Sequence, residues 1–277
     1  MSNTLLINSS NVIGSNKNSY QFNFINGMYK LSDDSAISIS SVTIPYSWFN
    51  VTSNYNNKSF NITWVNSGAS MTTYTLPDGF YSVADLNSYI QQLCITNGWY
   101  LVDSNGNNVY YIALSSNQNY YAVQLLLFQV PTSLPSGYSA PSNWAGYPSS
   151  SIAPSFGLNA SGSIASIIGF PGGVSYGGGV ANVSQLSTTT PNLTPVNSLV
   201  VRCSLCDNNV TMPSDILDSI PINATFGSNI TYTPSFEKWV RCKPGMYSNF
   251  QLVFSDQNLG VLYANDSNIS VTLLIKP

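Results

Sequence analysis

Cysteine is the residue type whose spacing comes nearest to a chemical site in this chain. Cys203 and Cys206 form a Cys-x-x-Cys pair, whereas Cys242 and Cys94 are single. Zinc usually takes four protein ligands, so one such pair supplies half of a site and needs a second pair or histidines to complete it. The chain has no histidine. Cys203, Cys206 and Cys242 are therefore a weak candidate for a metal site, and ordinary thiols are the favoured interpretation.

Other catalytic groups are equally sparse. The absence of histidine removes Ser-His-Asp and Cys-His nucleophilic catalysis. Glycoside hydrolysis needs two facing carboxylates, but Glu237 is the single glutamate and several aspartates occupy turn or cap positions. The glycines between residues 157 and 179 lack a phosphate-binding spacing and contain no lysine. We therefore expect no catalytic residue, no cofactor and no enzyme activity.

Charge is scarce throughout the chain. Only 7% of the 277 residues are charged, with 8 Lys+Arg against 11 Asp+Glu and a formal net charge of −3. Proteins that bind nucleic acid through phosphates need an excess of basic residues, so no nucleic-acid partner is expected. The 18 Tyr, 12 Phe and 5 Trp favour a folded chain. No stretch is long and apolar enough for membrane insertion, and no secretory signal is expected, which favours free thiols.

Two segments are candidates for contacts with a partner. The densest charge cluster, EKWVRCK, places Lys238, Arg241 and Lys243 close together in the sequence. They form either a cationic patch for an acidic neighbour or the solvated rim of an edge strand. The second segment spans residues 131–154, is rich in proline and serine, and carries Trp144 and Tyr147. Its prolines exclude a central strand, so we expect a long excursion pinned by its aromatic rings.

The elements that must position these residues are mostly strands. Alternation of apolar and polar residues predicts strands at 20–24, 36–42, 60–65, 71–76, 109–114, 123–128, 199–203, 222–226, 230–232, 250–254 and 269–275. Residues 82–97 are predicted to form a helix with Ser82 as N-cap and Gly98 beyond its end. A shorter helix is predicted over 214–220, after Pro213. Many strands with few helices indicate an all-β sandwich.

Several blocks, taken in order, resemble the penton (minor capsid) proteins of virophages and polinton-like viruses. The similarity covers roughly residues 36–275, and each block alone is short. The blocks are IPYSWFNV at 44–51, LPDGFYSV at 76–83, the segment 121–137, IGFP at 168–171, DIL at 215–217, IPI at 220–222 and VFSDQ at 253–257. The Cys-x-x-Cys pair with Cys242 is not part of that pattern.

The resemblance implies a single jelly-roll sandwich of about eight core strands, with extra strands, long loops and one or two short helices. It implies one domain over residues 1–277, with a Pro/Ser/Gly-rich loop excursion at about 130–180. It also implies a homopentamer at the fivefold vertices of an icosahedral capsid. The other implied partners are a double-jelly-roll major capsid protein and further minor capsid proteins. The expected location is the capsid vertex of the virion, after synthesis in the host cytoplasm.

A different class of function stays open beside this one. The supply of Tyr, Trp and Asn also suits a carbohydrate- or receptor-binding jelly-roll module on a virion, because sugars stack on aromatic rings and bind amides. On that interpretation, Trp144 or Trp99 would contact the glycan. Composition alone does not separate a sugar-binding surface from a protein interface.

Overall fold

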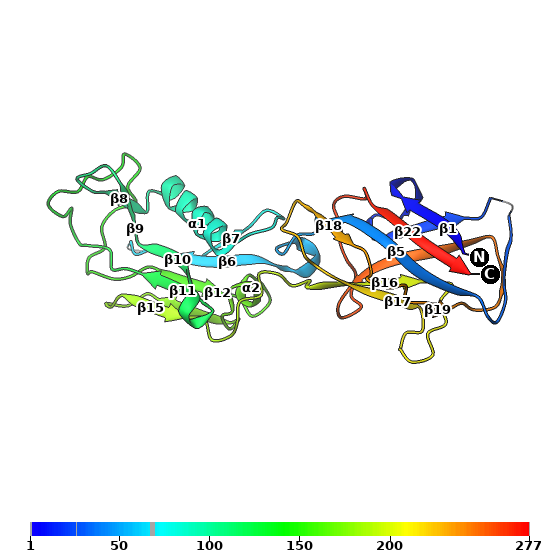
Figure 1. The fold of residues 1–277 in the computed structure, drawn as a ribbon. Helices are drawn as coiled ribbons and strands as arrows, with labels where there is room; N and C mark the ends of the chain where they lie inside the picture. Colours follow the sequence, from blue (N-terminus) through cyan, green and yellow to red (C-terminus); the bar gives the residue numbers. More distant parts are fainter. Residues whose placement is uncertain (1, 26, 67–69, 277) are drawn as a thin grey trace. The chain divides into compact units, whose positions relative to one another are not determined.

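The computed structural model describes residues 2–25, 27–66 and 70–276. Contacts within the chain divide it into two compact units. Unit 1 comprises the chain up to Trp48 together with the chain from Thr194 onward, and unit 2 comprises Phe49–Leu193. Each unit has its own sheets (Figure 1). The architecture is all-β, as predicted, with two α-helices among the described residues.

Unit 1 is a jelly roll. Its eight principal strands, in chain order, are β1 (Asn3–Asn8), β3 (Ser19–Asn23), β5 (Ala36–Pro45), β16 (Ser198–Cys203), β17 (Ile216–Pro221), β18 (Asn229–Tyr232), β21 (Asn249–Asp256) and β22 (Ser270–Lys276). One sheet has the order β1-β22-β5-β18 and the other β3-β21-β16-β17. Counted along the chain, these orders are 1-8-3-6 and 2-7-4-5, the arrangement of two interleaved Greek keys. The predicted jelly-roll fold is confirmed.

Four short strands complete unit 1. β2 extends the second sheet beyond β3, β19 pairs with β5 at the edge of the first sheet, and β4 pairs with β20. Their bounds are Val12–Ile13 for β2, Tyr29–Leu31 for β4, Val240–Arg241 for β19 and Gly245–Tyr247 for β20. Short additions of this kind shorten the exposed edges of the sheets.

The side chains of β5 show how alternation builds the core of unit 1. Ile37 and Ile39 are buried, and so are Val42 and Ile44, although the two pairs differ in parity. The register with β22 shifts here, because Ile39 pairs with Leu273 whereas Ser41 pairs with Thr272. Ser40 is therefore the extra residue of a β-bulge, and the bulge keeps both apolar pairs on the buried face.

Unit 2 is a second β structure, placed in the chain between β5 and β16. One sheet has the order β13-β6-β12-β14 with β7 beside β6, another has the order β10-β11-β15, and β8 pairs with β9. The strands are β6 (Asn57–Thr63), β7 (Thr72–Thr75), β8 (Tyr100–Val102), β9 (Asn108–Tyr110), β10 (Ile112–Asn117), β11 (Ala122–Leu127), β12 (Ser155–Leu158), β13 (Gly162–Ser163), β14 (Val174–Gly177) and β15 (Val183–Leu186).

Two α-helices, α1 (Val83–Asn97) and α2 (Ala165–Ile168), belong to unit 2. Three 3-10 turns lie at Ser9–Asn11, Ser53–Tyr55 and Gln118–Tyr120. No helix in the described part of the chain is both long and apolar enough to span a membrane.

Helix α1 matches its prediction closely. The Ser82 hydroxyl accepts a hydrogen bond from the Asp85 backbone N–H at 3.2 Å, and the Asp85 carboxylate accepts from the Ser82 N–H at 2.9 Å. This capping box satisfies donors that the first turn leaves unpaired. Val83, Leu86, Ile90 and Cys94 form the buried face, which packs into the core of unit 2.

Two predicted elements are wrong, and one expectation on domains stays open. Residues 216–221 form β17 rather than a helix, because their backbone pairs with β16. Residues 222–226 lie in the connection between β17 and β18 rather than in a strand. A single domain over residues 1–277 was expected, and contacts within the chain divide it into two compact units. The excursion at about 130–180 lies within unit 2. The assignment of residues 1–277 to a single domain stays a prediction.

Two glycines with positive φ, one at the end of α1 and one in the turn between β8 and β9, supply a matched pair of tests. Gly98 has φ +67°, and a Cβ added there would lie 1.9 Å from the Asn143 carbonyl oxygen, whereas Gly106 has φ +83° with open space around it. Gly106→Ala is expected to destabilise the protein by about 1 kcal/mol, the cost of a left-handed alanine. Gly98→Ala adds a backbone clash and should cost clearly more. Urea unfolding of both variants measures the loss in the free energy of unfolding, and equal losses for Gly98→Ala and Gly106→Ala would contradict the predicted clash.

Candidate functional site

At one end of unit 1, the loop after β21 holds both chain segments that connect to unit 2. The Ser47 hydroxyl accepts hydrogen bonds from the backbone N–H groups of Asn265 (3.1 Å) and Asp266 (3.0 Å). The Gln257 side chain donates to the Pro195 carbonyl at 2.8 Å and accepts from the Asn197 N–H at 3.2 Å. The departing and returning segments are thus fixed by neutral hydrogen bonds to one loop.

The departing segment is further fixed by aromatic packing. Tyr46 exchanges backbone hydrogen bonds with the turn before β18, donating to the Ser228 carbonyl at 2.9 Å and accepting from Gly227 at 3.0 Å. Its ring lies 4.5 Å from the Trp48 ring and 5.8 Å from that of Phe226, measured between centroids. Trp48 is buried. The block IPYSWFNV therefore begins at the end of β5 and continues as the exit from the jelly roll.

The basic segment lies at the edge of the first sheet of unit 1, where β19 pairs with β5. Lys238 donates to the Asp218 carboxylate at 3.0 Å and to the Tyr232 hydroxyl at 3.2 Å. The Asp218 side chain is only 9% exposed, against 45% for Lys238. The hydrogen bond to Asp218, followed by that to Tyr232, raises the pKa of Lys238 above its ordinary value. This ammonium group is consequently held in place by residues of its own chain.

Arg241 and Lys243 are held less firmly. Arg241 donates to the Asp33 carbonyl at 3.1 Å, and its ion pair with the Asp33 carboxylate is long, at 3.4 Å. The Asp33 side chain is 82% exposed, so this ion pair contributes little. Lys243 is placed by its backbone, which bonds to Leu205 at 2.8 Å. The segment is thus a charged edge of the sheet, and its role as an interface stays a prediction.

The aromatic candidates of the other segment lie in unit 2. Trp144 packs edge-on against Trp64 at 6.2 Å and lies 5.1 Å from Tyr147 between ring centroids. The Trp144 indole N–H and the Tyr147 hydroxyl are buried without a hydrogen-bond partner. Burial raises the pKa of Tyr147. Both residues are only partly exposed, so they offer a partner a limited surface.

Trp99 is not available as a sugar-stacking ring. Its side chain is buried, and its ring stacks on that of Trp64 at 5.3 Å with an interplanar angle of 10°. The suggestion that Trp99 contacts a glycan is therefore wrong, because the face that a sugar would need is covered by another indole.

The three candidate metal-ligating cysteines come together in unit 1. Cys203, Cys206 and Cys242 are each fully buried, and Cys206 lies opposite Cys242 in an antiparallel bridge. Burial, with a smaller effect of Cys203, raises the pKa of Cys242 to about 12. Cys94 is buried separately in α1, and burial raises its pKa to about 12. In the described part of the chain, no group of three Cys, Asp or Glu side chains is arranged to hold a metal ion.

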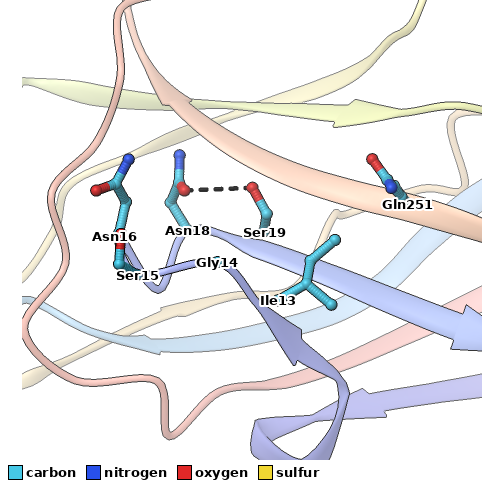
Figure 2. A pocket seen from close by; sticks show the side chains of 7 residues that line it. All are labelled: Ile13, Gly14, Ser15, Asn16, Asn18, Ser19 and Gln251. Carbon is cyan, nitrogen blue, oxygen red and sulfur yellow. Dashed lines mark hydrogen bonds between the residues drawn. The ribbon is translucent and has the colours of Figure 1, made fainter.

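A polar pocket lies on the second sheet of unit 1. It has a volume of about 290 Å³ and is lined by Ile13, Gly14, Ser15, Asn16, Asn18, Ser19 and Gln251. Figure 2 shows the amides of Asn16, Asn18 and Gln251 around it, with the Ser19 hydroxyl donating to the Asn18 side chain at 3.2 Å. The lining carries no charged group, so the pocket suits a neutral ligand with hydroxyl groups better than an ion.

A larger pocket lies in unit 2, with a volume of about 510 Å³. Two rings, Tyr55 and Phe170, line it together with small polar residues. Much of this polar lining is already bonded, since the Asn57 side chain donates to the Asn50 carbonyl at 2.8 Å and the Thr189 hydroxyl to the Gly169 carbonyl at 3.1 Å. The pocket therefore offers few free donors to a ligand.

Sequence reasoning missed the acidic partners of the basic residues. Asp218 lies on β17, which was predicted as a helix, and its contact with Lys238 is not visible in the sequence. In unit 2, Asp78 binds Lys58 at 2.6 Å and the Ser53 hydroxyl at 3.0 Å. The hydrogen bond from Lys58 is the largest cause of the lowered pKa of Asp78. No local pattern predicts either pairing.

The two acidic partners of the basic segment give a matched pair of variants. Asp218→Asn weakens a shielded ion pair and is expected to cost about 1–3 kcal/mol, because the amide cannot replace the charge-assisted bond to Lys238. Asp33→Asn removes an exposed, long ion pair and should change stability by less than about 0.5 kcal/mol. Urea unfolding at neutral pH measures both.

The Asp218 pair also fixes a pH dependence. The raised pKa of Lys238 means that its stabilising contribution is complete below the ordinary lysine value and is lost as pH rises through the folded-state value. When urea unfolding is repeated above that pH, the free energies of unfolding of the wild type and of Asp218→Asn should differ by less than at neutral pH. A difference that stays constant with pH would contradict the ion pair.

Comparisons with known proteins find a similarity of fold alone. No protein-family model and no curated protein matches the chain. A crystal structure of the selenomethionine-labelled mavirus penton protein is similar in fold, with 10% sequence identity and a TM-score of 0.44. The match covers 100% of this chain and 98% of that one. At this identity and TM-score the similarity carries no argument about function.

Proposed function

We propose that this chain is a structural capsid protein, a penton subunit that forms a homopentamer at the fivefold vertices of an icosahedral shell. The observation that carries the proposal is the strand order of unit 1, an eight-stranded jelly roll that holds a second β unit between its third and fourth strands. Jelly rolls of this kind are used by viral capsid proteins, lectins and cupins. A metal-dependent cupin site normally needs histidines, which this chain lacks.

The chemistry of the chain supports assembly rather than catalysis. A ring of five copies requires a heterologous contact, in which one face of a subunit meets a different face of the next. The charged edge formed by Lys238, Arg241 and Lys243 suits one side of such a contact, and the excess of aspartate elsewhere suits the other. Interfaces are depleted in charge and enriched in aromatic residues, as this composition is.

The resemblance of the sequence blocks to penton proteins supplies the rest of the proposal. It supports the virion vertex as the location of the chain. It also supports contacts with a double-jelly-roll major capsid protein and with other minor capsid proteins. Four of the blocks lie at the ends of strands of the jelly roll: IPYSWFNV at the end of β5, DIL at the start of β17, IPI at its end and VFSDQ at the end of β21.

Arg241→Glu tests the proposed contact. This exposed residue has only a weak ion pair of its own, so reversing its charge should leave the fold intact and weaken the ring. The expected effect is a rise of about tenfold or more in the concentration at which pentamers form. Lys30→Glu, on β4, is the control and should leave assembly unchanged. Light scattering gives the mass, and particle images give the rotational symmetry. A wild type that stays monomeric under all assembly conditions would overturn the proposal.

Carbohydrate binding is the second candidate: the unit 2 pocket offers a sugar two aromatic rings, Tyr55 and Phe170, for stacking, although few free hydrogen-bond donors. Ser166 is exposed at this pocket, and Ser166→Trp should block it. If the pocket binds sugars, the wild type gives a signal on a glycan array that Ser166→Trp removes, whereas Ser149→Trp, an exposed control, retains it. An array without any signal from the wild type rejects this candidate and leaves the structural role unaffected.

A further inference from the structure

The three buried thiols of unit 1 have a geometry that the structural role does not use. Cys206 and Cys242 lie directly opposite one another, flanked by the hydrogen bonds from Asp207 to Arg241 and from Lys243 to Leu205, both 2.8 Å. This pattern makes the cysteines a non-hydrogen-bonded antiparallel pair, in which the Cα atoms are about 4.5 Å apart and the side chains approach most closely. That separation lies within the range that disulfides span.

Cys203 adds a third sulfur to this pair. It lies one turn before Cys206, whose backbone N–H donates to the Cys203 carbonyl at 3.0 Å. The Cys203 and Cys206 thiols also share a hydrogen bond, which is the largest cause of the raised pKa of Cys206. Cys206 is thus the central sulfur, with one neighbour along its own chain segment and one across the bridge.

The cluster joins chain segments that belong to different sheets of the jelly roll. Cys203 is the last residue of β16 in the second sheet. Cys242 follows β19, which pairs with β5 in the first sheet, and its N–H donates to the Ser35 carbonyl at 2.8 Å. A bond between Cys206 and Cys242 would therefore link the chain segment leaving one sheet to the edge of the other.

We propose that Cys206 and Cys242 are a site of disulfide formation that locks the jelly roll when the protein meets a peroxide oxidant. The Cys206 thiolate attacks one oxygen of hydrogen peroxide, giving a sulfenic acid, while the second oxygen leaves as hydroxide and takes up the thiol proton as water. The Cys242 sulfur then attacks the Cys206 sulfur and expels a second water. Two thiols and one peroxide give one disulfide and two waters.

Burial determines when this reaction occurs. All three thiols are fully buried. The pKa of Cys206 is raised by its hydrogen bond to Cys203 and by burial, so little of the attacking thiolate exists near neutral pH. The bond therefore forms slowly, through local opening, and a reducing medium keeps the chain as thiols. Once formed, the disulfide closes a loop over residues 206–242 and is shielded from reductants, so the oxidised jelly roll should resist unfolding better than the reduced one.

Thiol counting and peptide mapping test the proposal on the full chain. The reduced protein carries four free thiols. After prolonged treatment with hydrogen peroxide, the unfolded protein should titrate with two, and mapping should link Cys206 to Cys242. The melting temperature should rise by about 5 °C or more. Four remaining thiols, a Cys203–Cys206 link or an unchanged melting temperature would each overturn the proposal.

Matched cysteine variants separate the site from general oxidation. Cys94→Ser, in unit 2, should keep both the linked peptide and the rise in melting temperature, whereas Cys242→Ser should lose both. If Cys242→Ser fails to fold, mapping of the wild type and of Cys94→Ser still decides the outcome. This test is independent of the oligomeric state, so it does not depend on the proposed capsid role.

Discussion

The register of β5 is the constraint on which unit 1 depends. This strand pairs with β22 along one edge and with β18 and β19 along the other. A one-residue slip would turn its apolar side chains toward solvent, and the bulge at Ser40 is what places both halves of the strand in register. Alternation then continues past the strand through Tyr46 and Trp48, both buried. The same register therefore sets where the chain leaves the jelly roll.

Hydrogen bonds from neutral side chains hold distant chain segments together in both units. In unit 2, the Asn50 side chain donates to the carbonyls of Tyr81 (2.8 Å) and Leu193 (2.9 Å) and accepts from the Tyr81 N–H (2.8 Å). In unit 1, Ser47 and Gln257 act in the same way. Bonds between neutral groups are not screened by salt as surface ion pairs are.

Local patterns predicted local elements well. The capping residues Ser82 and Gly98 gave both ends of α1, and clean alternation gave β3, β21 and β22. The incorrect predictions concern segments whose secondary structure is determined by tertiary contacts. Residues 214–220 have apolar spacing compatible with a helix, but pairing with β16 makes the segment a strand. The strand β1 went unpredicted because Leu5, Leu6 and Ile7 form an apolar run without alternation, although only Leu5 and Ile7 are buried.

The candidate sites also divide into features that local sequence patterns predict and features that tertiary contacts determine. Lys238, Arg241 and Lys243 were found because they are adjacent in the sequence, but Asp218, which holds Lys238, comes from another strand. The Cys-x-x-Cys pair was visible, whereas its antiparallel contact with Cys242 follows from the pairing of distant segments. Trp99 was chosen by residue type alone, and type does not reveal that another indole covers its face.

The pairing of β1 with β22 brings the two terminal strands side by side, with Asn3 opposite Ile275 (Figure 1). A short linker could therefore join them, and new ends could be opened at an exposed turn, giving a circular permutant with the same strand order. For engineering, a peptide fused at either terminus would emerge at one place on the jelly roll.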